Sequence, residues 1–382
     1  MNTYINTFPG YTFVYFDSDK KMHNVYRGVD VGKGGYVYSE PGMYGNVAVL
    51  DVQSQHPNSI IAMNCFGEYT AKFKELLDTR IALKHKDIET ARKMFNGRLE
   101  PYLQNEESAA ALSQALKIAI NSVYGITAAN FDNPFRDPRN LNNIVALRGA
   151  LFMKTLQDEV QARGFVVAHI KTDSIKLPDA TPEIIQFCMD FGKQYGYIFE
   201  LESTYDRICL VNKSTYIARY KDGKKAGQWE ATGLEFQVSY VYKTLFTKED
   251  ITFDDLCETK EVKTAMHLDM NEGLPEEEHA RHFIGKVGRM CPIKSGCGGG
   301  ELVRESKDKD GNIKYNSVTG AKGYRWLEAE TVQTLGKEGD IDLSYYEKQV
   351  EEAKASIRNY GQVEWFCSDK SYDKYDNEIL PF

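Results

Sequence analysis

The chain of 382 residues lacks the features that mark membrane-spanning, secreted or disordered proteins. Its longest apolar runs, such as residues 144–147 and 149–153, are interrupted by charge well before the ~18 residues that a membrane span needs. The N-terminus has no basic start and no apolar stretch, so we expect no signal peptide. The seven cysteines are scattered and odd in number, which favours a reducing compartment over a disulfide framework. An apolar content of 42% excludes a disordered chain.

The chain also lacks an excess of basic residues. Its 47 Lys and Arg residues against 55 Asp and Glu residues give a net charge of −8. Nucleic-acid-binding domains are usually basic, so this balance argues mildly against such a partner. It does not exclude one, because binding depends on where the charges lie rather than on their sum.

The order of apolar patterns and turn signals predicts an α+β fold. Asn46–Val52 is expected to be a strand, and Lys171-Thr172-Asp173 is expected to join two short strands in a hairpin. Helices are predicted over residues 70–98, 106–124, 143–164 and 182–195, with Gly125 ending the second and Thr181 capping the last. Strands should follow to about residue 237. We therefore expect a mixed or antiparallel sheet with helices on one face, from which residues 70–125 project.

Two acidic residues are placed where chemistry could use them. Asp51 ends an apolar strand, and Asp173 lies at the tip of the predicted hairpin. If the strands are neighbours, the two carboxylates converge and repel each other, and a hard cation such as Mg²⁺ would relieve the repulsion. For either residue alone, a turn residue at a strand end is the commoner explanation.

Three motifs in order give these carboxylates a context. Asp51-Val-Gln-Ser-Gln-His-Pro-Asn-Ser-Ile60 resembles motif A of the family B DNA polymerases. Lys117-Ile-Ala-Ile-Asn-Ser-Val-Tyr-Gly125 is similar to their motif B, and Thr172-Asp173-Ser174 to their motif C. Because three motifs occur in the family's order on suitable elements, the resemblance is strong. The residues of these motifs, including His56, are most similar to those of polymerases from tailed bacteriophages.

The resemblance implies a right-hand polymerase fold. Residues 46–70 and 126–240 would form the palm, residues 71–125 the helical fingers, and residues 241–382 the thumb or C-terminal region. Residues 1–45 resemble the linker that normally follows an exonuclease domain. We therefore expect either a truncated product or half of a split enzyme, whose exonuclease would be on a separate chain.

The resemblance also implies functions for individual residues. Asp51 and Asp173, with the carbonyl of Val52, would bind two Mg²⁺ ions. The residues expected to bind the dNTP are His56, Arg80, Lys84, Lys117, Asn121 and Tyr124. The residues expected to contact primer–template DNA are Gly34, Gly35, Gly125, Arg148, Lys213 and Tyr216. A solvated helix face is the alternative for Arg80 and Lys84.

Two positions depart from the family pattern. His56 stands where the family usually has a tyrosine that excludes a 2′-hydroxyl. Lys171 stands where motif C commonly has an aspartate, and it either weakens metal binding or points to solvent. The loop residues Phe131, Phe135, Arg136 and Arg139 either line the template path or only pack a proline-rich loop.

The function implied is template-directed DNA synthesis with release of pyrophosphate, in phage DNA replication in the cytoplasm of a bacterial host, with no membrane involved. The alternative is a non-catalytic DNA-binding or assembly subunit that retains the polymerase fold. In the last third, a zinc site at His279, His282, Cys291 and Cys297 is the alternative to a plain thumb, although the cysteine spacing is wider than usual.

Overall fold

The computed structural model describes residues 8–16, 18–138, 140, 143–275 and 278–373. The chain divides into two compact units. The first comprises Met1–Lys213 and Tyr220–Lys225, and the second comprises Ser214–Arg219 and Ala226–Phe382. All three predicted motifs lie in the first unit.

The first unit is built around an antiparallel sheet. Five of its strands lie side by side in the order β8-β5-β7-β6-β4. Their bounds are Val37–Ser39 (β4), Gly42–Val52 (β5), His169–Lys171 (β6), Ser174–Pro178 (β7) and Phe199–Asn212 (β8). A separate small sheet contains β1 (Tyr11–Phe16), β2 (Lys21–Tyr26) and β3 (Val29–Asp30). The predicted hairpin is confirmed, because β6 and β7 pair across residues 171–174.

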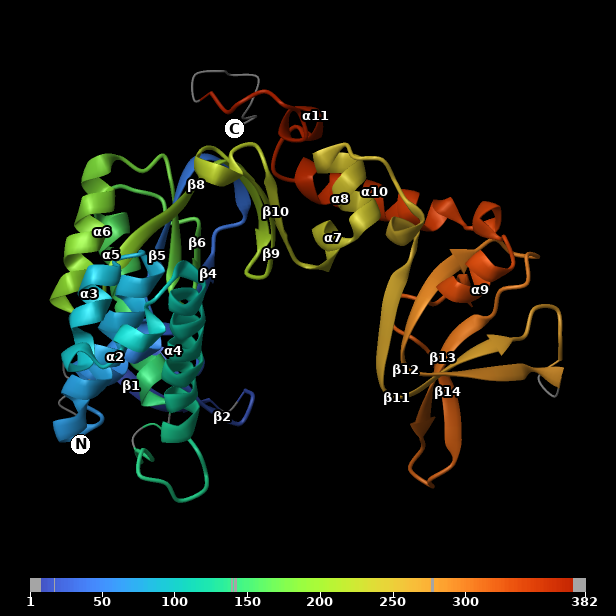
Figure 1. Ribbon diagram of the computed structural model, residues 1–382. Coiled ribbons are helices and arrows are strands. Elements are labelled where there is room, and N and C mark those ends of the chain that lie inside the picture. The colour runs from blue at the N-terminus through green and yellow to red at the C-terminus, as the bar shows by residue number, and fades with distance from the viewer. Residues whose placement is uncertain (1–7, 17, 139, 141–142, 276–277, 374–382) are drawn as a thin grey trace. The chain divides into compact units, whose positions relative to one another are not determined.

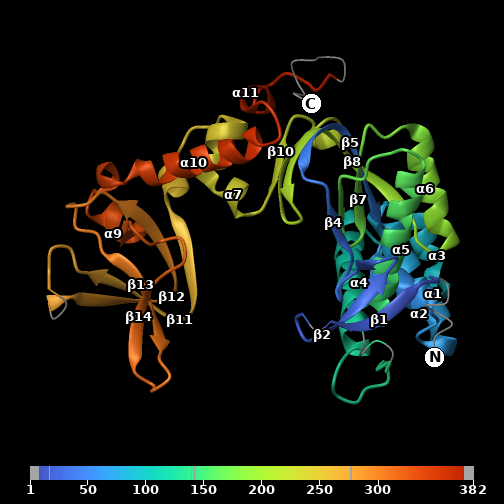
Figure 2. The same cartoon turned by 180° about the vertical axis from the view of Figure 1, so that it is seen from behind.

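Helices of the first unit pack beside this sheet. Their bounds are Gln55–Ala62 (α1), Thr70–Lys84 (α2), Ile88–Lys93 (α3), Glu106–Thr127 (α4), Ile144–Ala162 (α5) and Pro182–Gln194 (α6). Figure 1 shows α5 and α6 next to β5 and β8, and Figure 2 shows the same neighbours from behind. Helix α5 is buried on nearly all sides as far as Gln157, as expected for a core helix with apolar residues all round. Its side chains Phe152 and Leu156 share one core with Leu50 and Ile175 of the sheet.

The helices and strands end at other residues than predicted in three places. The helix expected over residues 70–98 is broken, because Lys86 has a positive φ of 60° and the Asp87 side chain caps α3 by accepting from Thr90 N–H. Helix α4 runs through Gly125 to Thr127 instead of stopping there. The expected strand up to residue 237 ends early, because Gly233, with φ 91°, leads into α7 (Leu234–Gln237).

The second unit contains its own antiparallel sheet, in the order β14-β13-β11-β12-β15. Its strands are Glu258–Met270 (β11), Ala280–Ile293 (β12), Glu301–Lys307 (β13), Ile313–Ser317 (β14) and Arg325–Glu328 (β15). The main helices are α8 (Ser239–Tyr242), α9 (Ala329–Thr334), α10 (Leu343–Arg358) and α11 (Val363–Phe366). Strands β9 (Thr215–Tyr220) and β10 (Trp229–Thr232) pair antiparallel. Trp326, Tyr346 and Met290 are fully buried in the core of this unit.

The predicted fold class is confirmed as a mixture of helices and antiparallel sheets, whereas the division into palm, fingers and thumb stays a prediction. Within the part of the chain that the structure describes, no helix is both long and apolar enough to cross a bilayer.

Candidate active site

The sheet brings the two predicted carboxylates together. Strands β5 and β7 are hydrogen-bonded neighbours in which Asp51 pairs with Ser174, the residue after Asp173. The N–H of Val52 donates to the carbonyl oxygen of Asp173 at 2.9 Å. The end of one strand is thus tied directly to the tip of the hairpin, and both carboxylates lie at the same edge of the fold.

The surroundings of Asp51 disfavour its ionised form. Burial raises its pKa to about 7, and the negative charges of Asp173, Glu202 and Glu200 act in the same direction. Glu200 pairs with Asp51 in the β5–β8 register, and a bulge between Val49 and Leu50 leaves Glu202 as an extra residue next to it. Burial raises the pKa of Asp173 as well. These are carboxylates held together against their repulsion.

The donor set suits a hard divalent cation. Half-buried carboxylate oxygens are ligands that Mg²⁺ prefers, and a cation would offset the repulsion that raises the pKa of Asp51. Within the described residues, neither Asp51 nor Asp173 forms an ion pair with a basic side chain. No group of three or more His, Cys, Asp or Glu side chains is assembled there for a metal either. The two carboxylates therefore fit a cation, but the protein alone supplies only part of a coordination shell.

Close packing fixes the hairpin that carries Asp173. The residues that make these contacts were not predicted from the sequence. Gly35 has φ 134°, and a Cβ there would lie 2.9 Å from the Cγ2 atom of Thr172. The Thr172 N–H donates to the Tyr36 carbonyl at 3.0 Å, and the Gln55 amide donates to the Thr172 carbonyl at 3.0 Å. A side chain at Gly149 of α5 would collide with Gln55. A glycine inside a helix was the available signal for this packing.

His56 and Tyr124 form one wall beside the carboxylates. Their ring centroids are 4.7 Å apart, with an interplanar angle of 51°. The Tyr124 hydroxyl donates to Asn143 Oδ1 at 2.6 Å, which fixes that ring. Burial lowers the pKa of His56, although the charge of Asp173 opposes this shift, so the imidazole is neutral at pH 7. The two predicted motifs A and B thus meet through these rings.

Helix α2 directs basic side chains toward this edge of the sheet. Arg80 donates to the Ser54 hydroxyl at 2.9 Å, just after β5. Lys84 contacts Glu200 at 2.7 Å, and His85 contacts the other oxygen of the same carboxylate at 2.8 Å. Arg80 and Lys84 therefore bond to the segments next to Asp51, rather than forming a plain solvated face. On α4, Lys117 and Asn121 are exposed.

The predicted DNA-contacting residues have different surroundings. Gly34, Gly125 and Lys213 are exposed, and no atom lies within 4 Å of a Cβ added at Gly34 or Gly125. Arg148 is only 8% exposed, donates to the Tyr195 carbonyl at 2.7 Å and lies over the Tyr197 ring. It is a core residue of α5, so the prediction that it contacts DNA is not kept.

Other predicted contacts also change. Tyr216 is 6% exposed, its hydroxyl donates to Glu230 at 2.6 Å, and its backbone pairs with Thr232 of β10, so it is part of the packed interior and its contact with DNA stays a prediction. Lys171 is exposed, in agreement with the solvent-pointing alternative. Phe131 and Phe135 are 66% and 46% exposed, and Arg136 lies 3.6 Å from Asp132. Arg139 lies outside the described residues.

The zinc hypothesis for the second unit is not supported. Cys291 is buried on β12 with its sulfur 3.3 Å from that of Cys257, whereas His279 contacts Asp269 at 3.5 Å. The cysteine and histidine side chains thus have different partners, and the described residues contain no group of three or more His, Cys, Asp or Glu side chains that could hold a metal ion.

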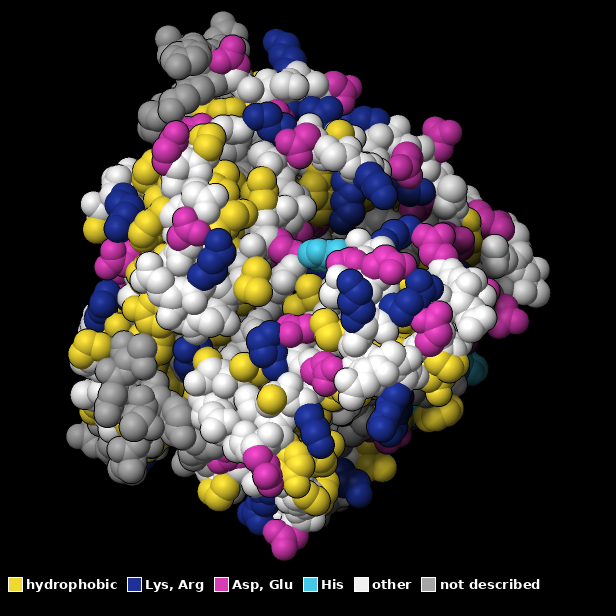
Figure 3. Space-filling view, turned by 60° about the vertical axis from the view of Figure 1, so that its left-hand side comes forward, with side chains coloured by type: hydrophobic (Ala, Val, Ile, Leu, Met, Phe, Trp, Pro, Cys, Tyr) yellow, Lys and Arg dark blue, Asp and Glu magenta, His cyan; other side chains and the backbone are white. Residues whose placement is uncertain are grey.

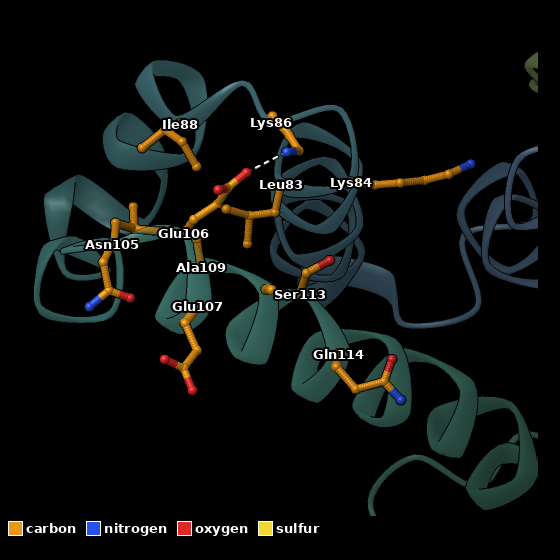
Figure 4. Close-up of a pocket in the computed structure, with 12 residues that line it drawn as sticks. Leu83, Lys84, Lys86, Ile88, Asn105, Glu106, Glu107, Ala109, Ser113 and Gln114 are labelled. Atoms are coloured by element: carbon orange, nitrogen blue, oxygen red, sulfur yellow. Dashed lines mark hydrogen bonds and ion pairs between the residues drawn. The ribbon is translucent and has the colours of Figure 1, made fainter. Parts of the chain in front are cut away.

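A cavity of about 880 Å³ lies in the first unit between α2, α3 and the start of α4. Figure 4 shows Lys86 and Glu106 paired across it, while Lys84 extends away from it. Asp51 and Asp173 are not among the residues that line this cavity, so it is distinct from the carboxylate site.

Comparison with known proteins finds similarity to DNA polymerases. No family model matches the chain. DNA polymerase II of Escherichia coli (strain K12) is 32% identical in an alignment of 155 positions, which covers 37% of this chain and 19% of that protein. Over this stretch the chain is similar to a DNA polymerase, and the expected resemblance to the family B polymerases is supported. The likeness to the polymerases of tailed bacteriophages stays a prediction.

One solved structure is similar to the chain over most of its length. The family B DNA polymerase of the hyperthermophilic archaeon Pyrobaculum calidifontis gives a TM-score of 0.46 at 14% identity, covering 84% of this chain and 46% of that one. The chain spans less than half of that protein and about a fifth of DNA polymerase II. The activity of the whole polymerases is therefore proposed for this chain rather than assigned.

Charge is mixed on the face shown in Figure 3, where Lys and Arg side chains lie interspersed with Asp and Glu side chains. On this face, affinity for a nucleic acid would therefore depend on individual cations rather than on a continuous basic patch.

Proposed function

We propose that this chain carries out template-directed DNA synthesis, transferring a nucleoside monophosphate from a dNTP to a primer 3′-hydroxyl. The observation that carries the proposal is the convergence of Asp51 and Asp173 on hydrogen-bonded strands, in a chain related to DNA polymerase II. The pKa values of these two half-buried carboxyl groups are raised, so their ionised forms are unfavourable alone and would be stabilised by a divalent cation.

Asp51, Asp173 and the Val52 carbonyl would hold Mg²⁺. When bound, the ions supply a lowered pKa for the primer hydroxyl and charge compensation at the phosphorus. The contribution of the protein is to keep the carboxylates in place. It does so through the Val52–Asp173 backbone hydrogen bond and the contact of Gly35 with Thr172.

The triphosphate would be met by cations from two helices. Arg80 and Lys84 extend from α2 toward the strand end that carries Asp51, and Lys117 is exposed on α4. Asn121 shares the face of Lys117, because it follows four residues later on the same helix. Charge-assisted hydrogen bonds to phosphate are the strong ones, so these residues would dominate nucleotide affinity.

The sugar would lie against His56. Its ring is packed on Tyr124, and Tyr124 is held in turn by Asn143. A flat ring fixed in this way can exclude a 2′-hydroxyl by collision, which is selection against the wrong substrate. For the DNA itself, Lys213, Gly34, Gly35 and Gly125 remain as proposed contacts. Gly35 would act through its packing on the hairpin.

The experiment is Mg²⁺-dependent primer extension on a templated duplex by wild type, Asp51→Asn, Asp173→Asn and the control Asp190→Asn. Asp190 is an exposed carboxylate of α6 paired with Lys193, so its loss should leave extension unchanged. We expect both site variants to fold, bind DNA and fail to extend. Near-normal extension by either one would reject the assignment. DNA binding by wild type without any extension would favour the non-catalytic subunit.

A further inference from the structure

One carboxylate of β8 binds the last residues of α2. Glu200 accepts from Lys84 Nζ at 2.7 Å and from His85 Nε2 at 2.8 Å, one on each oxygen. The amide of Gln53, just beyond β5, donates to the same group. The side chains of Lys84 and His85 are 48% and 49% exposed, and that of Glu200 is 28% exposed. Solvent and solutes can therefore reach the contact.

This contact occupies the basic side chains that a triphosphate would need. Arg80 lies one helical turn before Lys84 on α2, so both are on the same face of the helix. Glu200 pairs directly with Asp51 in the β5–β8 register. Figure 4 shows Lys84 directed away from the cavity lined by Ile88 and Glu106, so it is not held on that side.

We propose that Glu200 is a displaceable carboxylate, which holds Lys84 and His85 until the triphosphate of an incoming nucleotide takes its place. His85 is then a further phosphate-binding residue, which the sequence motifs did not indicate. The inference rests on the proposed function, since it concerns the same nucleotide site. It adds an exchange of partners: the chain releases one carboxylate and binds phosphate oxygens with the same donors.

The energetics allow this exchange. Ion pairs between partly exposed side chains contribute little to stability, so the contact orders the end of α2 but is easily broken. A triphosphate has several charges and many acceptor oxygens, whereas Glu200 has one charge and two oxygens. It is therefore the stronger acceptor for the two adjacent donors, Lys84 Nζ and His85 Nε2.

The test is a binding measurement that needs no turnover. The full chain, bound to a primer that lacks a 3′-hydroxyl, is titrated calorimetrically with dNTP and, separately, with inorganic triphosphate. Glu200→Gln keeps the shape of the side chain and removes its charge, so we expect about 3- to 10-fold tighter binding of both ligands. The control is Glu106→Gln, which breaks the nearby Lys86–Glu106 ion pair on the cavity side and should change neither affinity.

His85 is tested where no carboxylate competes for it. In the Glu200→Gln background, His85→Ala removes only the phosphate contact, so both affinities should fall about 3- to 10-fold. Binding of dNTP but not of inorganic triphosphate would mean that the base and sugar, rather than the phosphates, drive displacement, and would overturn the proposal. The proposal would also be overturned if Glu200→Gln bound both ligands no more tightly than wild type, while Glu106→Gln bound them as tightly as wild type. If Glu200→Gln unfolds, Glu200→Ala removes the same acceptor oxygens, and it too should bind dNTP and triphosphate more tightly than wild type.

Two further outcomes separate this inference from the proposed function. Primer extension by wild type, with no tighter ligand binding in either Glu200 variant, would leave the polymerase function standing and reject the exchange. Tightening without extension would retain a triphosphate site and reject the polymerase function.

Discussion

Replacing Asp51 by Asn should stabilise the metal-free chain, and more so at high pH. A carboxyl whose pKa is raised on folding binds its proton more tightly in the folded state than in the unfolded state. The ionised form therefore opposes folding. The penalty is absent below the unfolded pKa of 3.8, grows as the pH rises, and is complete above the folded pKa of about 7. Asparagine has no such penalty at any pH.

The magnitude follows from the size of the shift. The shift from 3.8 to about 7 corresponds to an upper bound of ~4 kcal/mol at about 1.4 kcal/mol per pH unit. Asp51 is partly exposed, so solvent screening reduces this to about 1–2 kcal/mol between pH 5 and pH 8. Removing the charge also relieves the repulsion that Asp51 exerts on Asp173.

The assay is urea unfolding in a chelator at pH 5 and pH 8, comparing wild type with Asp51→Asn. The matched control is Asp190→Asn, because Gln186 and Lys193 lower the pKa of Asp190 and its loss should not stabilise the chain. Added Mg²⁺ should then stabilise wild type more than Asp51→Asn, since a ligand that binds only the folded state raises stability. An Asp51→Asn variant less stable than wild type at pH 8 would refute the electrostatic reasoning.

Three other predictions concern neighbouring residues. Lys117→Ala should lower kcat/KM for dNTP by about 10- to 150-fold and leave duplex affinity nearly unchanged in fluorescence titrations, because a charge-assisted contact contributes ~1.5–3 kcal/mol. His56→Ala should raise ribonucleotide incorporation relative to deoxyribonucleotide in single-nucleotide assays, and an unchanged ratio would transfer the selection to a neighbour such as Tyr124. Gly35→Ala should destabilise the chain by about 1–3 kcal/mol in denaturant unfolding, through its positive φ and the collision with Thr172, whereas Gly34→Ala should be nearly neutral.

The sequence predicted the parts of the site that depend on local pattern. An apolar strand that ends in Asp51 and a hairpin tip at Asp173 can be read from alternation and turn residues, and the structure places both on paired strands. The spacing of Lys117, Asn121 and Tyr124 on one helix was equally predictable.

The remainder depends on contacts between distant segments. The bulge at Glu202, the ion pairs of Glu200 and the close approach of Gln55 to Gly149 involve residues far apart in the chain. Burial of Arg148 follows from helix α5 being surrounded on all sides, which a single charged residue in an apolar helix did not reveal. The break after Lys84 depends on a cap at Asp87 that competes with helix continuation.

Template dependence tests the central claim most directly. Wild-type chain is given four primer–template duplexes that differ only in the base opposite the next position, with each dNTP in turn and Mg²⁺. The account predicts that only the complementary nucleotide is added efficiently on each template, and that Asp51→Asn and Asp173→Asn add none. Addition that ignores the template base, or addition that survives loss of either carboxylate, would contradict it.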